Sequence, residues 1–293
     1  MELDYVKLIE IKPVLAGYIR ESQNLMKLSV VPGDKTVHDV RVLMKKSRAV
    51  LNLTGNQMGN DFFKMDILDL RKVGRILSSW RETAVNRKIL KDLRKENPDI
   101  FSLLQEDERV NALLTKEDSV HELSGEMKER LKEIDELLSK TSFRIRFQSM
   151  DKLDPQLLVK ELAMTYSSVT DIYLTCRNNS KPNNLHEFRK RAKEFLYQLY
   201  FFKPLNPSAV KALEKKLNSM TRNIGNFNDH TQLVETLGYK YSATSNTPVM
   251  DELVIKIREK QDKCLAQVWP VAYKIFCPGQ NLVNVLGFKV LII

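Results

Sequence analysis

Glycine and proline are scarce in this sequence, each occurring only 10 times in 293 residues. Strands need frequent turns, and turns are rich in these two residues, so their scarcity favours long helices over many short strands. Hydrophobic residues make up 43% of the chain. That share is typical of a globular protein and excludes a disordered one.

Cysteine is rarer still. Cys176, Cys264 and Cys277 are odd in number, lie far apart and form no CxxC motif. They indicate neither a disulfide framework nor a zinc site, and they fit a reduced environment. We therefore expect a cytoplasmic protein.

Long apolar runs are also missing, since no stretch reaches the roughly 18 residues that a membrane helix needs. The first residues, MELDYVKLIEIK, include early acids and no small-residue cleavage site, so we expect no signal peptide. The apolar tail NLVNVLGFKVLII is interrupted by Lys289 and is expected to dock on the protein. We predict no membrane partner.

Charge of one sign is in excess. Lys and Arg total 47 against 37 Asp and Glu, which gives a net charge of +10. An excess of this size favours a polyanionic partner, whether nucleic acid, an anionic membrane or a phosphate polymer. A basic but inert surface remains an open alternative at this point.

Helical periodicity dominates the whole chain and predicts an all-α fold. The predicted helices span residues 3–30, 36–54, 61–95, 98–115, 119–148, 155–178, 184–203, 207–238 and 248–275. Most prolines fall at the starts of these segments or between them, as helices require. Residues 116–140 are rich in alternating charge, which predicts a solvated helical face.

An internal repeat is the most informative feature. Residues 36–52, TVHDVRVLMKKSRAVLN, align without gaps with residues 184–200, NLHEFRKRAKEFLYQLY. The alignment pairs His38 with His186, Arg41 with Arg189, and Lys45 with Lys193.

A second repeated block follows at nearly the same interval. VGRILSSWRETA (73–84) matches MTRNIGNFNDHT (220–231), which pairs Arg75 with Arg222, Trp80 with Phe227, and Glu82 with Asp229. We expect the aromatic pair in the core and the acids in salt bridges. Two blocks in one order predict a duplicated unit with a boundary near residue 150. The prediction is one domain, 1–293, built from four-helix-bundle repeats at 1–150 and 151–293 that are related by a pseudo-twofold axis.

Two parallel stripes run along each repeated helix. The predicted core stripes are Val37, Val40, Met44, Ser47 and Leu51 in the first copy, and Leu185, Phe188, Ala192, Phe195 and Leu199 in the second. The basic stripes are His38, Arg41, Lys45, Arg48 and Asn52, and His186, Arg189, Lys190, Arg191 and Lys193. Successive cations on such a stripe lie about 5 Å apart along the axis, which suits a chain of linked phosphates.

The starts of the repeated helices also favour an anion. Thr36 with Asp39, and Asn184 with Glu187, have the character of capping boxes. Each histidine would then lie in the first turn, beside free backbone N–H groups. A lone histidine there is usually a surface or capping residue. The recurrence of His-x-x-Arg-x-x-x-Lys in both halves therefore carries the prediction of a binding site.

The repeated helices, VHDVRVLMKKSRAVLNL and LHEFRKRAKEFLYQLYFF, each followed by a helix with an Arg and an acid seven residues later, resemble the conserved histidine α-helical domain, or CHAD domain. The resemblance covers nearly the whole chain. It implies two four-helix bundles around a basic groove or cavity that binds inorganic polyphosphate, and targeting to polyphosphate granules. The binding residues it implies are His38, Arg41, Lys45, Lys46, Arg48, Arg75, His186, Arg189, Lys190, Arg191, Lys193 and Arg222.

The two copies differ at two positions of the first block. Glu194 stands where the first copy has Lys46, and Leu196 stands where it has Arg48. We therefore expect the second helix to contribute less charge to the site.

Three other functions compete with polyphosphate binding. An enzyme is disfavoured because the sequence has no Gly-rich phosphate loop, GxSxG motif or Cys/His pairing, and we predict no catalytic residue, metal or cofactor. An RNA-binding protein would need exposed aromatics beside the cations, for which Tyr197 and Tyr200 are candidates. A helical scaffold with an incidental basic surface is the third alternative.

Overall fold

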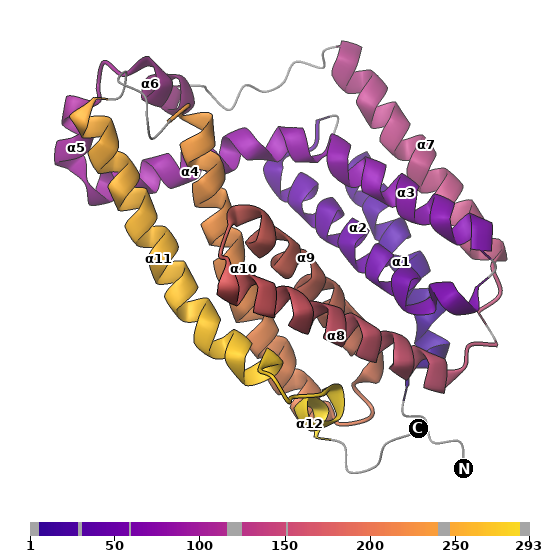
Figure 1. The fold of residues 1–293 in the computed structure, drawn as a ribbon. Helices are drawn as coiled ribbons and strands as arrows, with labels where there is room; N and C mark the ends of the chain where they lie inside the picture. The colour runs from indigo at the N-terminus through magenta and orange to yellow at the C-terminus, as the bar shows by residue number, and fades with distance from the viewer. Residues whose placement is uncertain are drawn as a thin grey trace.

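The computed structural model describes residues 6–28, 31–58, 60–115, 125–150, 152–239 and 247–287, without the side chains of residues 60–62 and 79–83. These residues form α-helices and two short 3-10 helices, with no strand among them, which confirms the all-α prediction (Figure 1). The α-helices are α1 (Leu8–Lys27), α2 (Asp34–Thr54), α3 (Asn60–Ile76), α4 (Ser78–Glu96), α5 (Pro98–Leu103), α6 (Glu108–Thr115), α7 (Gly125–Phe147), α8 (Pro155–Asn178), α9 (Pro182–Gln198), α10 (Pro207–Thr236), α11 (Pro248–Phe276) and α12 (Leu282–Leu286). The 3-10 helices are η1 (Gly55–Gln57) and η2 (Leu199–Phe202).

Two predicted helices are each divided in the structure. The segment 61–95 breaks at Leu77, between α3 and α4, where the Ser78 hydroxyl donates to the Gly74 carbonyl at 2.9 Å. A serine that bonds back onto the preceding turn bends a helix. The segment 98–115 breaks before α6 because Asp107 caps a new helix, accepting from the backbone N–H of Arg109 at 2.9 Å.

The other predicted ranges are close to the observed helices. The tail expected to dock on the protein is described only as far as Gly287, where α12 ends, so the docking of residues 288–293 lies outside the described residues. No described helix is both long enough and apolar enough to cross a membrane.

Eight of the described α-helices form two groups of four (Figure 1). In the first group, α1 packs on α2, α2 on α3, α3 on α7, and α7 on α1. In the second group, α8 packs on α9, α9 on α10, α10 on α11, and α11 on α8. Helices α2 and α9 carry the repeated first block, and they pack against each other where the two groups meet. The packing order is thus the same in both groups, while the duplication itself stays a prediction.

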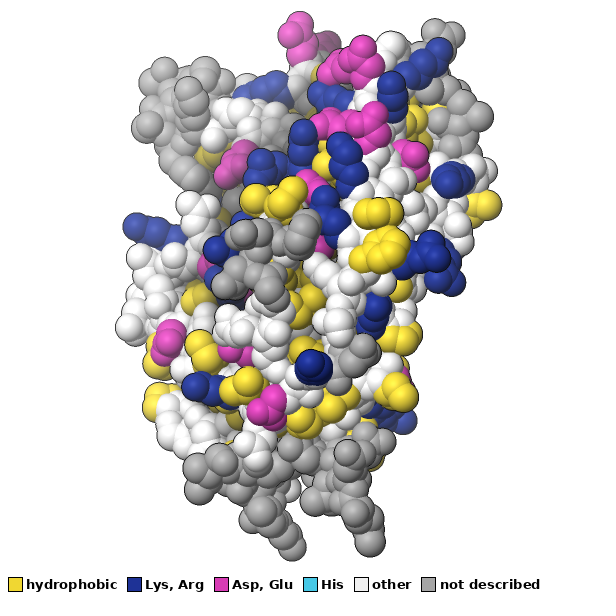
Figure 2. All heavy atoms as spheres, turned by 90° about the vertical axis from the view of Figure 1, so that its right-hand side faces the viewer, with side chains coloured by type: hydrophobic (Ala, Val, Ile, Leu, Met, Phe, Trp, Pro, Cys, Tyr) yellow, Lys and Arg dark blue, Asp and Glu magenta, His cyan; other side chains and the backbone are white. Residues whose placement is uncertain are grey.

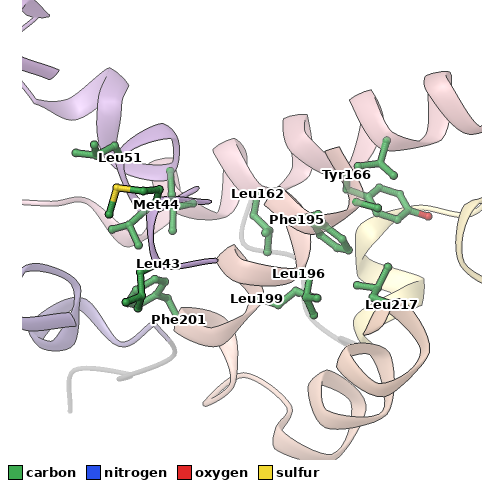
Figure 3. Packing of buried hydrophobic residues seen from close by; sticks show 14 of the residues in the cluster. Leu43, Met44, Leu51, Leu162, Tyr166, Phe195, Leu196, Leu199, Phe201 and Leu217 are labelled. Atoms are coloured by element: carbon green, nitrogen blue, oxygen red, sulfur yellow. The ribbon is translucent and has the colours of Figure 1, made fainter. Parts of the chain in front are cut away.

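A continuous apolar core lies beneath both groups (Figure 3). Every residue of the two predicted core stripes is buried in it or packed against it. Phe188 and Phe195 on α9 are fully buried, and the Phe195 ring lies 5.6 Å from that of Tyr166 on α8. Burying one such side chain stabilises the fold by about 1.5–3 kcal/mol. This packing fixes which face of α2 and α9 turns away from the core.

The two halves of the sequence interlock. A second apolar cluster joins Leu90 and Leu93 of α4, together with α5 and α6, to Leu233 of α10 and to Leu253 and Ile257 of α11. Helix α4 therefore bridges the two groups, since it contacts α2 and α3 of the first and α10 of the second (Figure 1). Both apolar clusters thus contain residues from before and after residue 150, so the two halves share their core.

The side of the molecule formed by α3 and α7 has mixed charge. Figure 2 shows Lys and Arg side chains lying among Asp and Glu on this face. Arg144 of α7 binds Asp66 of α3 at 2.6 Å and also Asp69, while Arg130 binds Glu126 at 2.6 Å. Because these cations are paired with neighbouring carboxylates, this face is not a candidate anion-binding site.

Candidate functional site

A cavity of about 480 Å³ lies where α2, α3 and α9 meet. Its lining contains nine Lys and Arg side chains, one histidine and a single carboxylate, that of Glu194. The cationic residues are Arg41, Lys45 and Arg48 from α2, Arg71 and Arg75 from α3, and Arg189, Lys190, Arg191 and Lys193 from α9. Residues distant in sequence thus form one concave, positively charged surface.

Nine of the twelve predicted binding residues line this cavity: Arg41, Lys45, Arg48, Arg75, His186, Arg189, Lys190, Arg191 and Lys193. The other three lie outside its lining. His38 is exposed on α2, Arg222 is exposed on α10, and Lys46 places its ammonium 5.3 Å from the centre of the Tyr18 ring. In the lining, α9 contributes four Lys and Arg and the carboxylate of Glu194, whereas α2 contributes three Lys and Arg and no acid, so the two helices bring the same net charge.

The two histidines occupy equivalent positions in their helices. Each is the fifth residue, since α2 begins at Asp34 and α9 at Pro182. The predicted capping boxes are therefore wrong: Thr36 and Asn184 lie inside the helices, and neither helix has a side-chain cap. Proline at the first position of α9 fixes φ for a helix, which lets it start earlier. Burial, followed by the Arg189 charge, lowers the pKa of His186.

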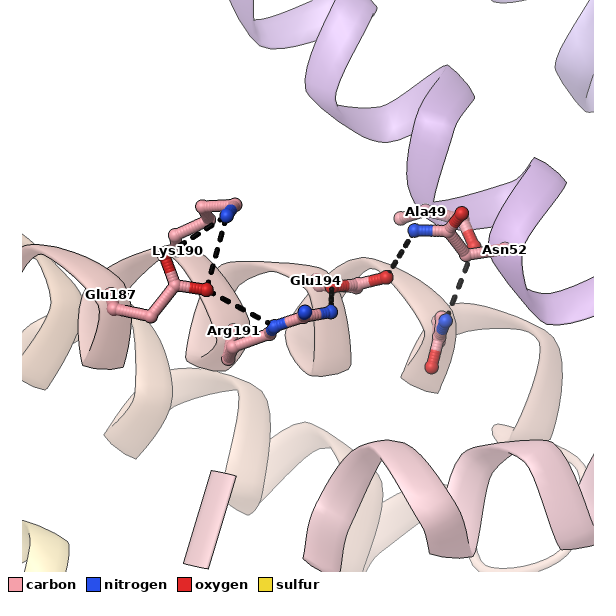
Figure 4. A network of polar contacts seen from close by, with 7 residues as sticks. Ala49, Asn52, Glu187, Lys190, Arg191 and Glu194 are labelled. Atoms are coloured by element: carbon pink, nitrogen blue, oxygen red, sulfur yellow. Dashed lines mark hydrogen bonds and ion pairs between the residues drawn. The ribbon is translucent and has the colours of Figure 1, made fainter. Parts of the chain in front are cut away.

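The α9 wall of the cavity carries its own counter-charges (Figure 4). Glu187 binds Lys190 at 2.9 Å and Arg191 at 3.3 Å, and Arg191 also binds Glu194 at 3.0 Å. Glu194 accepts a further hydrogen bond from the Asn52 amide of α2. These bonds tie α9 to α2 and orient Arg191, while they offset part of the positive charge of this wall.

Arg189 is held in place by α10. Its Nε donates to the Thr221 carbonyl at 3.0 Å, and its guanidinium passes over Gly225. A Cβ at Gly225 would lie 2.9 Å from the Arg189 Nε, which is closer than side-chain contacts allow. The second repeated block therefore acts through its backbone, by positioning an arginine of the first.

Lys193 is an unusual lysine. Burial, together with the charges of Arg189 and Lys46, lowers its pKa to about 8. Its ammonium donates to the Asn218 side chain at 3.3 Å and lies 5.7 Å from the centre of the Tyr197 ring. A desolvated cation with cationic neighbours becomes more stable when an anion binds beside it.

Arg71 belongs to the cavity lining, although it is not among the binding residues predicted from the sequence. It precedes Arg75 by four residues on α3, and that spacing places both on one helix face. This four-residue spacing could have indicated Arg71 from the sequence. The internal repeat did not indicate it, because only Arg75 aligns with a basic residue in the second half. Arg71 also lies close enough to Arg48 for its charge to lower the pKa of that guanidinium, after the larger effect of burial.

Two further predictions concern the second block. Phe227 is buried, with 8% of its surface exposed, which confirms the expected core position. The side chains of Trp80 and Glu82 lie outside the described residues, so the core position and the salt bridge predicted there stay predictions. Among the described residues, no group of three or more His, Cys, Asp or Glu side chains could hold a metal ion.

Comparison with known proteins agrees with the arrangement of these helices. No curated protein matches the chain. The family model of the CHAD domain, by contrast, matches residues 18–238, a span that contains α2, α3, α9 and α10 and therefore the whole cavity. The chain belongs to the CHAD domain family.

Proposed function

We propose that this protein binds inorganic polyphosphate in the cavity between α2, α3 and α9, without catalysing a reaction on it. The observation that carries the proposal is the composition of the lining, with nine Lys and Arg against one Glu. A concave surface of one sign focuses its field and attracts a ligand of the opposite sign. Membership of the CHAD domain family, which is associated with polyphosphate binding, supports the same ligand.

The chemistry of the lining residues fits phosphate. Guanidinium groups bind phosphate oxygens in pairs through a planar fork, and ammonium groups add an adaptable point charge. Arg41 of α2 and Arg189 of α9 both line the cavity. A linear polyanion in the cavity would be contacted from both halves of the chain. Such binding would also carry the protein to polyphosphate granules.

A nucleic-acid ligand is less favoured by the side chains present. Single-stranded binding usually depends on aromatic surfaces on which bases stack. Tyr197 lines the cavity but is half-buried beneath the Lys193 ammonium. Tyr200 lies outside the lining, and its hydroxyl donates to Glu10 at 2.6 Å. The cavity therefore offers phosphate contacts without a clear base platform.

The test compares long-chain polyphosphate, single-stranded RNA and duplex DNA at one fixed salt concentration, followed by a salt titration. We expect polyphosphate to bind most tightly. The logarithm of the binding constant should fall linearly with the logarithm of the salt concentration, with a slope of about −0.7 per contacted phosphate if it behaves as single-stranded nucleic acids do. Tighter binding of RNA, or a flat salt response, would refute the proposal.

A further inference from the structure

Arg48 and Arg71 form a pair of arginines that only the first half of the chain possesses. In the register of the repeat, Leu196 stands opposite Arg48, and extending the second block by two residues places Asn218 opposite Arg71. Leu196 is buried in the core, and Asn218 accepts a hydrogen bond from Lys193. The cavity is therefore built from similar helices but is chemically unequal on its two sides.

Arg48 is incompletely satisfied in the unliganded protein. Its Nε is buried, and no hydrogen-bond acceptor in the described part of the chain reaches it. A buried donor without a partner is costly, because it has lost water and gained nothing in exchange. Burial and the charge of Arg71 both lower the pKa of Arg48, so an anion between these two groups would stabilise both.

The carboxylates of the cavity supply that anion only in part, because the Glu194 charge raises the pKa of Arg48 while no described carboxylate accepts a hydrogen bond from its Nε. Glu194 is the one carboxylate in the described lining, and it is engaged by Arg191 and Asn52. Glu187, next along α9, is engaged by Lys190 and Arg191. The α9 wall is thus partly neutralised from within, whereas the described lining residues of α2 and α3 include no acid.

We propose that Arg48 and Arg71 form an arginine clamp that holds one phosphoryl group of the bound polyanion, so that the ligand is anchored on the α2–α3 wall. This inference rests on the proposed function and assigns the strongest contact within it. Two guanidinium forks on one phosphoryl group satisfy its oxygens and fill the unmet hydrogen bond of Arg48. The α9 wall then guides the rest of the chain.

The experiment measures Kd for long-chain polyphosphate and for tripolyphosphate with Arg48→Gln, Arg71→Gln and the double variant. Arg94→Gln is the matched control, because Arg94 is an exposed arginine of α4 that lies outside the cavity lining and was not predicted to bind. We expect each clamp variant to weaken binding roughly 10-fold to 150-fold, as loss of a charged hydrogen bond does, and the control to change it far less. The fold-loss should be similar for both ligands, since one phosphoryl group is affected.

The double variant tests the clamp itself. Both arginines hold the same group, so the double variant should lose less than the product of the two single losses. Arg48→Lys keeps the charge but lacks the fork, and it should remain weakened. Without ligand, Arg48→Gln should unfold at an unchanged or higher temperature, because it removes a half-buried charge whose buried Nε has no hydrogen-bond acceptor.

Three results would overturn the clamp: an affinity loss for Arg71→Gln equal to that for Arg94→Gln, a loss for the double variant equal to the product of the single losses, or a lower unfolding temperature of unliganded Arg48→Gln. These outcomes are distinct from failure of the proposed function. If wild-type protein bound neither phosphate ligand, the function itself would be wrong. If wild type bound both and the clamp variants matched the control, only the clamp would be withdrawn.

Discussion

Reversing the charge of one cavity arginine on α2 and one on α9 should reveal whether polyphosphate binding depends on the location of the cations or only on the net charge of the protein. The perturbation is Arg41→Glu combined with Arg189→Glu, on α2 and α9. The matched control is Lys128→Glu combined with Lys132→Glu, two exposed lysines on α7. Both double variants change the net charge by the same amount. Long-range attraction of a polyanion is therefore nearly equal in the two proteins, and only the location of the charge differs.

The expected magnitude follows from the phosphate hydrogen bonds that the two substitutions remove. A hydrogen bond between a charged group and phosphate contributes about 1.5–3 kcal/mol. Removing two of them weakens binding by roughly 100-fold to 10,000-fold if their effects add, since about 1.4 kcal/mol corresponds to tenfold. The α7 variant should weaken binding much less, because α7 packs on α1 and α3 and contributes no residue to the cavity lining.

The assay is titration of a labelled long-chain polyphosphate at fixed salt, with circular dichroism to check that both variants remain helical. Arg189 also donates to the Thr221 carbonyl, so the milder pair Arg41→Gln and Arg189→Gln provides a second version that introduces no new charge. Its control is Lys128→Gln with Lys132→Gln. Equal losses of affinity in the cavity and α7 variants would mean that binding uses diffuse charge, and the site assignment would be wrong.

Three further outcomes are expected. Lys193, with a pKa of about 8, is charged below that pH, and an anion favours its charged form. Polyphosphate affinity should therefore fall above about pH 8 by up to tenfold per pH unit, and any further rise in acid belongs to His186, whose pKa is lowered by burial. Lys193→Arg should remove the fall above pH 8, and an unchanged profile in that range would contradict the prediction. Gly225→Ala should displace the Arg189 guanidinium and weaken polyphosphate binding roughly tenfold, with little loss of helix. Its control is Gly17→Ala, at a position with open space around it, which should leave Kd unchanged in the same titration. Phe195→Ala should lower the free energy of unfolding by about 3–5 kcal/mol in urea denaturation. Phe143→Ala, on the exposed face of α7, should lower it by less than about 1.5 kcal/mol. Similar values for the two variants would show that the α9 core contact does not stabilise the fold.

Much of the fold could be read from local patterns. The apolar stripes of α2 and α9 follow from the helical period alone, and their residues are buried as predicted. Helix ends were less predictable, because they depend on single hydrogen bonds. The Ser78 hydroxyl divides one predicted helix, and the Pro182 ring moves the start of α9 ahead of the expected cap.

Part of the candidate site could likewise be predicted from the sequence, and part depended on packing between helices. Periodicity placed Arg41, Lys45 and Arg48 on one face of a single helix, and the repeat identified Arg189 and Lys193 as their counterparts. Nothing in one helix says which other helix will face it, so the exclusion of His38 and Arg222 from the cavity lining could not be foreseen.

The sequence by itself determined that this chain forms helices with a buried apolar side and a basic side, because the side chains along one helix follow a fixed period. Only the tertiary structure decided that α2 and α9 pack together, that α3 adds Arg71 and Arg75, and that Glu187 and Glu194 offset charge on one wall. The physical reason is range. Helical periodicity acts over a few residues, whereas the cavity arises from packing between segments that lie more than 100 residues apart.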